Sequence, residues 1–157
     1  MIHSYRAGID VGSTTVKLVI LDGDGAVLFG EYRRHRARIQ ETLAELLREA
    51  MSKLGVCRLA LTATGSGAMG LAKAMEIGFE QEVVAVAAAL RREAPQTDVA
   101  IELGGEDAKI IYFTGGLEER MNGVCAGGTG SFIDQMAALL QLDAKGLDEA
   151  AAHYKEI

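Results

Sequence analysis

Long apolar runs are scarce in this sequence, and their scarcity argues against a membrane-spanning protein. The longest uncharged apolar run, "VVAVAAAL" at residues 83–90, is too short to cross a bilayer. Its flanks, Glu82 and Arg91, instead predict a buried helix of a globular protein. The N-terminus has no long apolar segment behind a basic start, so we expect no secretory signal. These absences predict a cytoplasmic protein without a membrane partner.

Cysteine is scarce in this sequence. The two cysteines, Cys57 and Cys125, form no Cys-x-x-Cys pair, which argues against a disulfide scaffold. Cys57 precedes an aliphatic strand, where a small buried core side chain is expected.

The net charge of −6 at pH 7 argues against a nucleic-acid partner. One basic cluster, "RRHRAR" at residues 33–38, has two interpretations: contact with the phosphates of a partner or coenzyme, or a solvated strand end that leads into a helix. We favour the second.

The composition is that of a globular protein. The 157 residues are 49% hydrophobic and 24% charged, which suits one domain or two small lobes and argues against disorder. Apolar patterns and turn residues predict strands at residues 6–12, 15–22, 26–34, 58–65, 98–103 and 108–113, with a further candidate at 116–123. Helices are predicted at residues 39–54, 67–75, 81–93 and 130–141, with a last amphipathic segment within 147–154.

The order of these elements predicts a mixed α/β fold in which antiparallel hairpins lead each half. "DGDG" at residues 22–25 is a strong hairpin turn signal between two of the strands. The strict alternation of strand and helix that is typical of a doubly wound sheet is missing. Ala94, Pro95 and Gln96 mark the boundary between the halves. We therefore expect a first lobe at residues 1–95 and a second at 96–157.

The most informative stretch is "GIDVGSTTVK" at residues 8–17, where an acid, a glycine and three hydroxyl side chains interrupt an aliphatic strand. A second stretch, "VAIELGGEDAKIIYF" at 99–113, aligns with "AGIDVGSTTVKLVIL" at 7–21 without a gap. The alignment matches Asp10 with Glu102, Gly12 with Gly104, and Lys17 with Lys109. Two ordinary hairpins with glycine turns remain an alternative, but two copies in register favour a shared function.

Each copy predicts a strand, a tight glycine-containing turn and a return strand. Such a turn lets backbone N–H groups converge on an anion. The hydroxyls of Ser13, Thr14 and Thr15 and the charge of Lys17 would strengthen anion binding. A carboxylate beside a phosphate requires a cation, and Mg²⁺ is commonly held by one or two carboxylates together with substrate phosphates. The candidate carboxylates are Asp10, Glu102, Glu106 and Asp107.

"GSGAMG" at residues 65–70 fits the dinucleotide pattern G-x-G-x-x-G, and it follows a predicted strand and opens a helix. No second strand that ends in an acid follows about 20 residues later, where the ribose ligand of that motif belongs. Glu82 lies near this spacing but at the start of a helix. We therefore interpret the stretch as a tight strand-to-helix turn.

"GIDVGSTTVK" and "IELGGEDAK" resemble the two phosphate motifs of the superfamily that contains actin, the sugar kinases and the chaperone ATPases. "TATGSGAMGLA" at 62–72 and "MNGVCAGGTGSFIDQMA" at 121–137 resemble one family within it. These are the BadF/BadG/BcrA/BcrD-type ATPases, which activate 2-hydroxyacyl-CoA dehydratases and benzoyl-CoA reductases. The long, tandem-domain members, called CoA-substrate-specific enzyme activases, are most similar. Where the short-form members more usually have Asp-Ile-Gly-Gly-Gln-Asp, this chain has "ELGGED" at residues 102–107.

The resemblance implies an actin-like ATPase fold, also described as ribonuclease H-like, with a complete first lobe and the beginning of a second. It also implies that ATP and Mg²⁺ bind, and that hydrolysis to ADP drives low-potential electron transfer. The electron would pass from a [4Fe–4S] cluster to an acyl-CoA dehydratase or reductase-like partner. The implied catalytic residues are Asp10, which would hold Mg²⁺ through water, Glu106 and Asp107. The implied phosphate-binding residues are Gly12, Ser13, Thr14, Thr15, Lys17, Gly104 and Gly105.

Cys125 stands before "AGGTGS", which leads into a predicted helix N-terminus. The free N–H groups there favour a thiolate and would stabilise an anionic cluster. From the residues alone, an inert cysteine beside a phosphate or packing loop is favoured. The resemblance reverses this order, because family members hold the cluster between the subunits of a homodimer, with two cysteines from each. Cys125 matches the first cysteine, and no match to the second precedes Ile157.

Two other functions stay open at this stage. A small-molecule kinase would use the same hairpins to transfer phosphate to a sugar or an acid. A non-catalytic nucleotide-binding module would use them for assembly alone. We also expect this chain by itself to be inactive, because the adenosine motif of the superfamily does not appear in it. Apolar side chains such as Ile110 and Phe132 would then lie exposed and recruit a partner chain.

Overall fold

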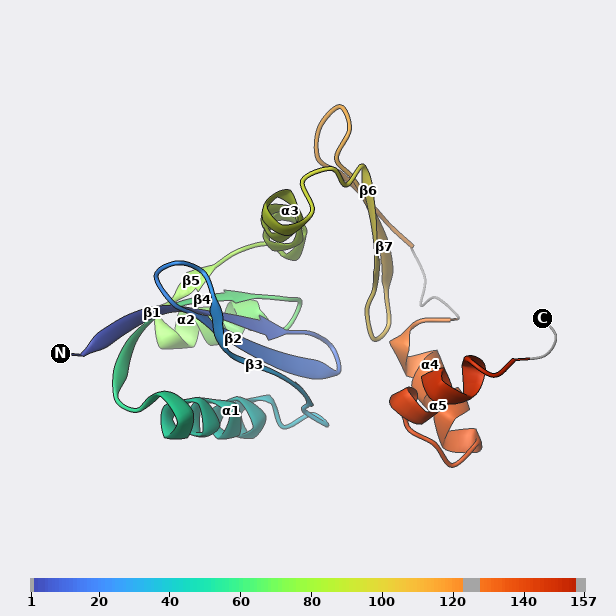
Figure 1. The fold of residues 1–157 in the computed structure, drawn as a ribbon, viewed down its shortest axis with the longest axis horizontal. Coiled ribbons are helices and arrows are strands. Elements are labelled where there is room, and N and C mark those ends of the chain that lie inside the picture. The colour runs from blue at the N-terminus through green and yellow to red at the C-terminus, as the bar shows by residue number, and fades with distance from the viewer. Residues whose placement is uncertain (1, 123–127, 155–157) are drawn as a thin grey trace. The chain divides into compact units, whose positions relative to one another are not determined.

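The chain folds into two compact units. The computed structural model describes residues 2–122 and 128–154, and the units are Met1–Thr97 and Asp98–Ile157. The first contains β1 (His3–Val11), β2 (Thr15–Leu21), β3 (Val27–Arg34), α1 (Ile39–Leu54), β4 (Cys57–Thr64), α2 (Ala68–Met75), β5 (Gly78–Phe79) and α3 (Glu82–Glu93). The second contains β6 (Val99–Leu103), β7 (Ala108–Tyr112), β8 (Glu118–Met121), α4 (Gly130–Leu139) and α5 (Ala144–Ala151) (Figure 1).

A five-stranded sheet in the order β3-β2-β1-β4-β5 lies at the centre of the first unit. β1 pairs antiparallel with β2 and parallel with β4, so it is the central strand. Alternate residues of β1, namely Ala7, Ile9 and Val11, are buried on one face, as the two-residue period of a strand requires. Leu46 of α1 and Ala72 of α2 belong to the same apolar core, so both helices pack on this face.

α1 begins at Ile39 and ends at Leu54, as its apolar period predicts, and the chain leaves it through Gly55 with a φ of 72°. Leu43, Leu46 and Ala50 form its buried stripe. Burying one such leucine contributes about 2 kcal/mol, so the stripe fixes α1 on the sheet. α1 is the longest helix in the described part of the chain, and no described helix has the length and apolar character needed to span a membrane.

Several element ends differ from the predicted bounds, and three elements differ for a physical reason. β5 comprises two residues, too few for a period to reveal it. α3 is not the buried helix that was expected. Its apolar residues lie on all sides of the helix, but only one side is covered by other described residues, so Ala87 is buried whereas Val84 is 38% exposed. α5 begins at Ala144, earlier than expected, because the side chain of Asp143 caps it by accepting a hydrogen bond from the N–H of Gly146 at 2.8 Å.

The second unit has a three-stranded antiparallel sheet in the order β6-β7-β8 and a small core. Its buried apolar side chains among the described residues are Ile111 and Ala137. Ile110 and Phe132 are 36% and 45% exposed, so the predicted exposure of these two residues is confirmed. β6 is an edge strand among the described residues, whereas β1, its counterpart in the first unit, pairs on both sides.

Candidate functional site

The β1–β2 hairpin brings the acid, glycine and lysine of the first motif together. Its register sets Asp10 directly opposite Lys17. A hydrogen bond of 2.9 Å from the N–H of Gly12 to the carbonyl of Thr15 closes the turn. The tip, residues 12–15, consists of a glycine and three residues with short hydroxyl side chains. Short side chains leave room for backbone N–H groups to converge on an anion.

Asp10 and Lys17 form an ion pair across this hairpin, with Nζ of Lys17 2.7 Å from Oδ2 of Asp10. The Tyr32 ring lies 5.8 Å from the same Nζ. Burial alone would lower the pKa of Lys17, but the hydrogen bond and the charge of Asp10 outweigh it and raise the pKa above its ordinary value of 10.5. Lys17 thus stays charged and engages one oxygen of the carboxylate. Its predicted contact with phosphate stays a prediction.

Two buried oxygen atoms beside this ion pair have no hydrogen-bond partner among the described residues. They are Oδ1 of Asp10 and Oγ1 of Thr64. The two residues are register partners in the parallel β1–β4 pair, so both oxygens belong to the same end of the sheet. An unpaired buried polar atom costs about 1–3 kcal/mol, which is why such atoms are usually satisfied by water, an ion or a ligand.

These oxygens fit a hydrated Mg²⁺ better than a fully enclosed metal. Within residues 2–122 and 128–154, no group of three or more His, Cys, Asp and Glu side chains could hold a metal ion. Mg²⁺ needs no such group, because it keeps several waters and takes one or two carboxylates plus phosphate oxygens. The carboxylate of Asp10 and the hydroxyl of Thr64 are suitable partners for those waters.

The turn from β4 to α2 closes over the Asp10 carboxylate. Gly65 has a φ of 96°, and a Cβ there would lie 2.4 Å from the carbonyl oxygen of Val11 and 2.5 Å from Oδ1 of Asp10. The N–H of Gly67 donates to the same carbonyl of Val11 at 2.9 Å. The structure thus confirms "GSGAMG" as a tight strand-to-helix turn. No sequence pattern indicates that this turn also encloses Asp10, since the pairing of β1 with β4 brings them together.

A small side chain at Gly12 would cause no clash among the described residues. A Cβ on Gly12 would meet Oγ1 and the carbonyl oxygen of Thr15 at 3.6 and 3.7 Å, which are ordinary van der Waals distances. Packing within the described residues therefore does not require glycine at this position. A missing side chain instead permits close approach of a ligand to the backbone. Of the neighbouring hydroxyl residues, Ser13 is exposed and Thr14 half-buried, whereas Thr15 is 7% exposed.

The β6–β7 hairpin of the second unit repeats this geometry. Glu102 lies opposite Lys109, as Asp10 lies opposite Lys17, with Nζ of Lys109 3.6 Å from a carboxylate oxygen of Glu102. A hydrogen bond of 2.8 Å from the N–H of Gly104 to the carbonyl of Asp107 closes the turn. The sequence repeat is therefore a repeat of strand register and turn closure as well.

The start of α4 fixes the second turn. The N–H groups of Gly130 and Ser131 donate to the carbonyls of Gly104 and Gly105 at 2.9 and 2.8 Å. These are N–H groups that a helix start leaves without an intrahelical partner, so the turn and the helix satisfy one another. A Cβ on Gly130 would lie 3.1 Å from the carbonyl oxygen of Gly104, so a larger residue would loosen the contact. The predicted catalytic residues Glu106 and Asp107 are exposed on this turn.

The predictions for the two cysteines have different outcomes. Cys125 lies outside the described residues, so its predicted role as a cluster ligand stays a prediction. Cys57 is a free thiol and half-buried, which corrects the expectation of a buried core side chain. Cys57 is the first residue of β4, where it pairs with His3 at the start of β1, away from the apolar centre of the sheet.

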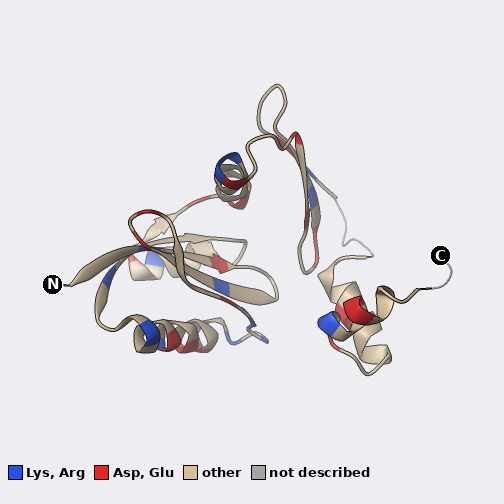
Figure 2. Ribbon diagram, in the orientation of Figure 1, with Lys and Arg blue, Asp and Glu red and all other residues tan. Residues whose placement is uncertain are grey.

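The basic cluster at residues 33–38 connects β3 to α1, as the favoured interpretation predicts (Figure 2). Arg33 donates two hydrogen bonds to the carboxylate of Glu49 at 2.8 and 3.0 Å, and these bonds hold the pKa of Glu49 below its ordinary value. Arg38 pairs with Glu41 at 3.5 Å. These exposed pairs place the cluster at the surface, and such pairs contribute little to stability.

Comparison with known proteins places this geometry in a family. The sequence profile of the BadF/BadG/BcrA/BcrD ATPase family matches residues 7–156. The (R)-2-hydroxyglutaryl-CoA dehydratase activating ATPase of Acidaminococcus fermentans is 33% identical over 156 residues, which cover 94% of this chain and 58% of that protein. The 2-hydroxyisocaproyl-CoA dehydratase activator of Clostridioides difficile is 31% identical over 155 residues, which cover 91% and 55%. The chain thus spans little more than half the length of these curated relatives.

Solved structures agree with the sequence relatives. The activator of the 2-hydroxyisocaproyl-CoA dehydratase from Clostridium difficile, with bound ADPNP, has a TM-score of 0.82 and 28% identity, over 97% of this chain and 58% of that chain. Component A of the Acidaminococcus fermentans (R)-2-hydroxyglutaryl-CoA dehydratase has a TM-score of 0.83 and 27% identity, over 99% and 61%. These matches confirm the predicted mixed α/β, actin-like ATPase fold.

Proposed function

Because this chain belongs to the BadF/BadG/BcrA/BcrD ATPase family, we propose that it is the phosphate-binding part of an ATPase that activates an acyl-CoA dehydratase or a benzoyl-CoA reductase-like partner. Relatives named as activators of 2-hydroxyglutaryl-CoA and 2-hydroxyisocaproyl-CoA dehydratases support the proposal. The observation that carries it is the environment of Asp10. One carboxylate oxygen of Asp10 is buried without a hydrogen-bond partner among the described residues, next to a turn in which packing does not require glycine at residue 12.

The phosphates of ATP would bind at the turn formed by residues 12–15. The hydroxyls of Ser13 and Thr14 are the accessible side-chain donors, and Thr15 is proposed as a third. Backbone N–H groups of the turn other than that of Gly12, which closes the turn, would add to them. Lys17 would keep the local charge favourable to the phosphates while it orients Asp10. The second turn, with Gly104 and Gly105, is proposed as a further phosphate contact because it repeats the first in register and closure.

Asp10 and Thr64 would hold the waters of Mg²⁺ through their buried oxygens. When bound, Mg²⁺ would neutralise phosphate charge and stabilise the charge that develops on the leaving oxygen. In hydrolysis, a water oxygen bonds to the γ-phosphorus and the bond to the ADP oxygen breaks. Glu106 or Asp107 would orient this water and accept its proton, because a positioned carboxylate can act as a general base.

The proposal couples hydrolysis to electron transfer. A [4Fe–4S] cluster, when bound, would supply the low-potential electron for the partner enzyme. Cys125 is the proposed ligand from this chain, and a homodimer would complete the ligand set. The stretch that follows Cys125 leads to the start of α4, and α4 holds the turn at Gly104 and Gly105, so phosphate binding and the cysteine segment are connected along the chain.

Anaerobic purification of the complete gene product tests this function. An activator should hydrolyse ATP without an added acceptor and contain iron. A kinase should require a sugar or an acid acceptor and contain no iron, whereas an assembly module should bind nucleotide without turnover. Cys125→Ala should remove the iron and the electron transfer while it spares ATP binding. Full iron content in that variant would reject the assignment of Cys125.

A further inference from the structure

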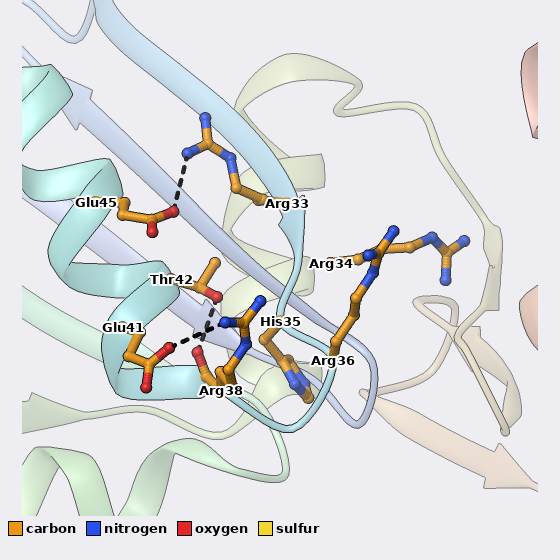
Figure 3. Close-up of a pocket in the computed structure, with 8 residues that line it drawn as sticks. All are labelled: Arg33, Arg34, His35, Arg36, Arg38, Glu41, Thr42 and Glu45. Carbon is orange, nitrogen blue, oxygen red and sulfur yellow. Dashed lines mark hydrogen bonds and ion pairs between the residues drawn. The ribbon is translucent and has the colours of Figure 1, made fainter.

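His35 is buried beside the first phosphate turn, although it belongs to the basic cluster at the surface. Only 6% of its surface is exposed, whereas Arg34 and Arg36 on either side of it are exposed. It lies in the connection between β3 and α1, among the arginines of residues 33–38 (Figure 3). A buried imidazole needs hydrogen-bond partners for both ring nitrogens, so its partners reveal its role.

The partners of His35 define its tautomer. Nδ1 accepts a hydrogen bond of 3.1 Å from the N–H of Ala37. A nitrogen that accepts carries no hydrogen, so in the neutral ring the hydrogen is on Nε2. Nε2 lies 3.2 Å from the carbonyl oxygen of Gly12 and therefore donates to it. The ring thus connects residue 37 to the phosphate turn.

The backbone of His35 holds the same turn at a second point. Its N–H donates to the carbonyl of Thr14 at 3.1 Å. His35 therefore engages the carbonyl oxygens of both Gly12 and Thr14, and the N–H of Gly12 closes the turn on Thr15. A carbonyl oxygen carries partial negative charge and repels phosphate. When two carbonyls are held on the side of His35, the N–H groups between them stay available to an anion.

We propose that His35 is a positioning residue of the ATPase site, which fixes the carbonyls of Gly12 and Thr14 so that the turn presents its N–H groups to phosphate. The inference rests on the proposed function and adds a residue outside both phosphate motifs. His35 touches no reacting atom. It acts through the backbone of residues 12–14, and it orders the turn before the nucleotide binds.

The backbone of the connection between β3 and α1 holds the His35 ring in place. Arg36 and Ala37 have φ values of 48° and 64°, and the N–H of Arg38 donates to the carbonyl of His35 at 2.7 Å. Left-handed backbone is unfavourable for a non-glycine residue, so the rest of the connection must stabilise it. The hydroxyl of Thr42 donates to the carbonyl of Arg38 at 2.8 Å, but the N–H of Thr42 donates to the same carbonyl at 3.0 Å, so this carbonyl does not depend on the hydroxyl.

Three variants of the complete protein test the proposal. His35→Leu keeps a bulky side chain but removes the donor to Gly12, so it should weaken Mg-ATP binding and raise KM about tenfold while kcat changes less than about threefold. His35→Gln retains an N–H at a similar distance from the backbone and should restore KM to within about threefold of wild type. Thr42→Val is the matched control, since it removes a part-buried hydrogen bond from the same connection without touching the turn. It should leave KM unchanged.

Hydrogen exchange at the amide of Gly12 gives a readout that needs no nucleotide. This amide closes the turn, so its exchange should accelerate about tenfold in His35→Leu and stay unchanged in Thr42→Val. If wild-type protein fails to hydrolyse ATP while exchange follows this pattern, the proposed function fails and the positioning role stands. If His35→Leu matches Thr42→Val in both KM and exchange, the positioning role is wrong. A Gln variant as impaired as the Leu variant would also contradict it.

Discussion

Nζ of Lys17 lies 2.7 Å from Oδ2 of Asp10, while Oδ1 of the same carboxylate is buried without a hydrogen-bond partner among the described residues. The two oxygens of Asp10 therefore have different environments, one neutralised by a cation of the protein and one suited to the water of a bound metal ion. Glu102 and Lys109 occupy the same register in the second hairpin, at 3.6 Å. A carboxylate directly across the strand pair from a lysine is thus a feature of both hairpins.

Removal of the Lys17 charge should show a characteristic pH dependence. The pKa of Lys17 is raised in the folded protein, so the ion pair stabilises the fold fully below the ordinary value of 10.5 and loses its contribution as the pH rises through the folded-state pKa. The difference in unfolding free energy between wild type and Lys17→Met should therefore be constant from about pH 8 to 10 and shrink at higher pH. Urea denaturation across this range measures it. A difference that grows above pH 10.5 would contradict the ion pair.

A pair of glycine substitutions separates ligand access from folding. Gly12→Ala meets ordinary contact distances, so it should leave the unfolding free energy within about 1 kcal/mol of wild type and weaken Mg-ATP binding. Gly65→Ala should destabilise the protein by more than about 1 kcal/mol, because its Cβ would lie 2.4 Å from a carbonyl oxygen at a φ of 96°. Thermal denaturation and calorimetry on both variants measure these effects. Unchanged affinity in Gly12→Ala would show that no ligand approaches this glycine.

The two sheets should differ in local stability. β1 pairs on both sides and packs on two helices, whereas β6 has a free edge among the described residues and the second unit has few buried apolar side chains. Amides of β6–β8 should therefore exchange with solvent at least about tenfold faster than those of β1, β2 and β4. Hydrogen exchange followed by mass spectrometry on this chain measures the difference. Equal protection in both sheets would mean that another segment or a second copy covers the second sheet.

The hairpins were predictable from sequence because their geometry is local. The register of an antiparallel pair follows from the length of its turn, so the repeated pattern was enough to predict a strand, a glycine turn and a return strand in each copy. The pairing of each acid with its lysine was not predicted and comes from the structure. The stripe of α1 was predictable for a similar reason, since the helical period places Leu43, Leu46 and Ala50 on one side.

The remainder of the site depends on contacts between distant segments. Thr64 and Gly65 reach Asp10 through the parallel pairing of β1 with β4, and no local pattern encodes that pairing. His35 looked like one member of a solvated basic run, and the packing of the connection before α1 turns its ring toward Gly12. α3 was misjudged because an apolar composition does not reveal how much of a helix finds a surface to pack on.

The most direct test of the account is ATP hydrolysis by the complete protein and its Asp10→Asn variant. Asn keeps the shape of the side chain but loses the charge that would orient hydrated Mg²⁺. The variant should therefore fold normally and hydrolyse ATP slower by one or more orders of magnitude, given what metal-ion charge stabilisation contributes. Asp22→Asn is the control, because Asp22 stabilises the β2–β3 turn by accepting from the N–H of Ala26 at 2.8 Å, outside the turn at residues 12–15. It should retain wild-type turnover. Unchanged turnover in Asp10→Asn would contradict the assignment of Asp10 to the phosphate site.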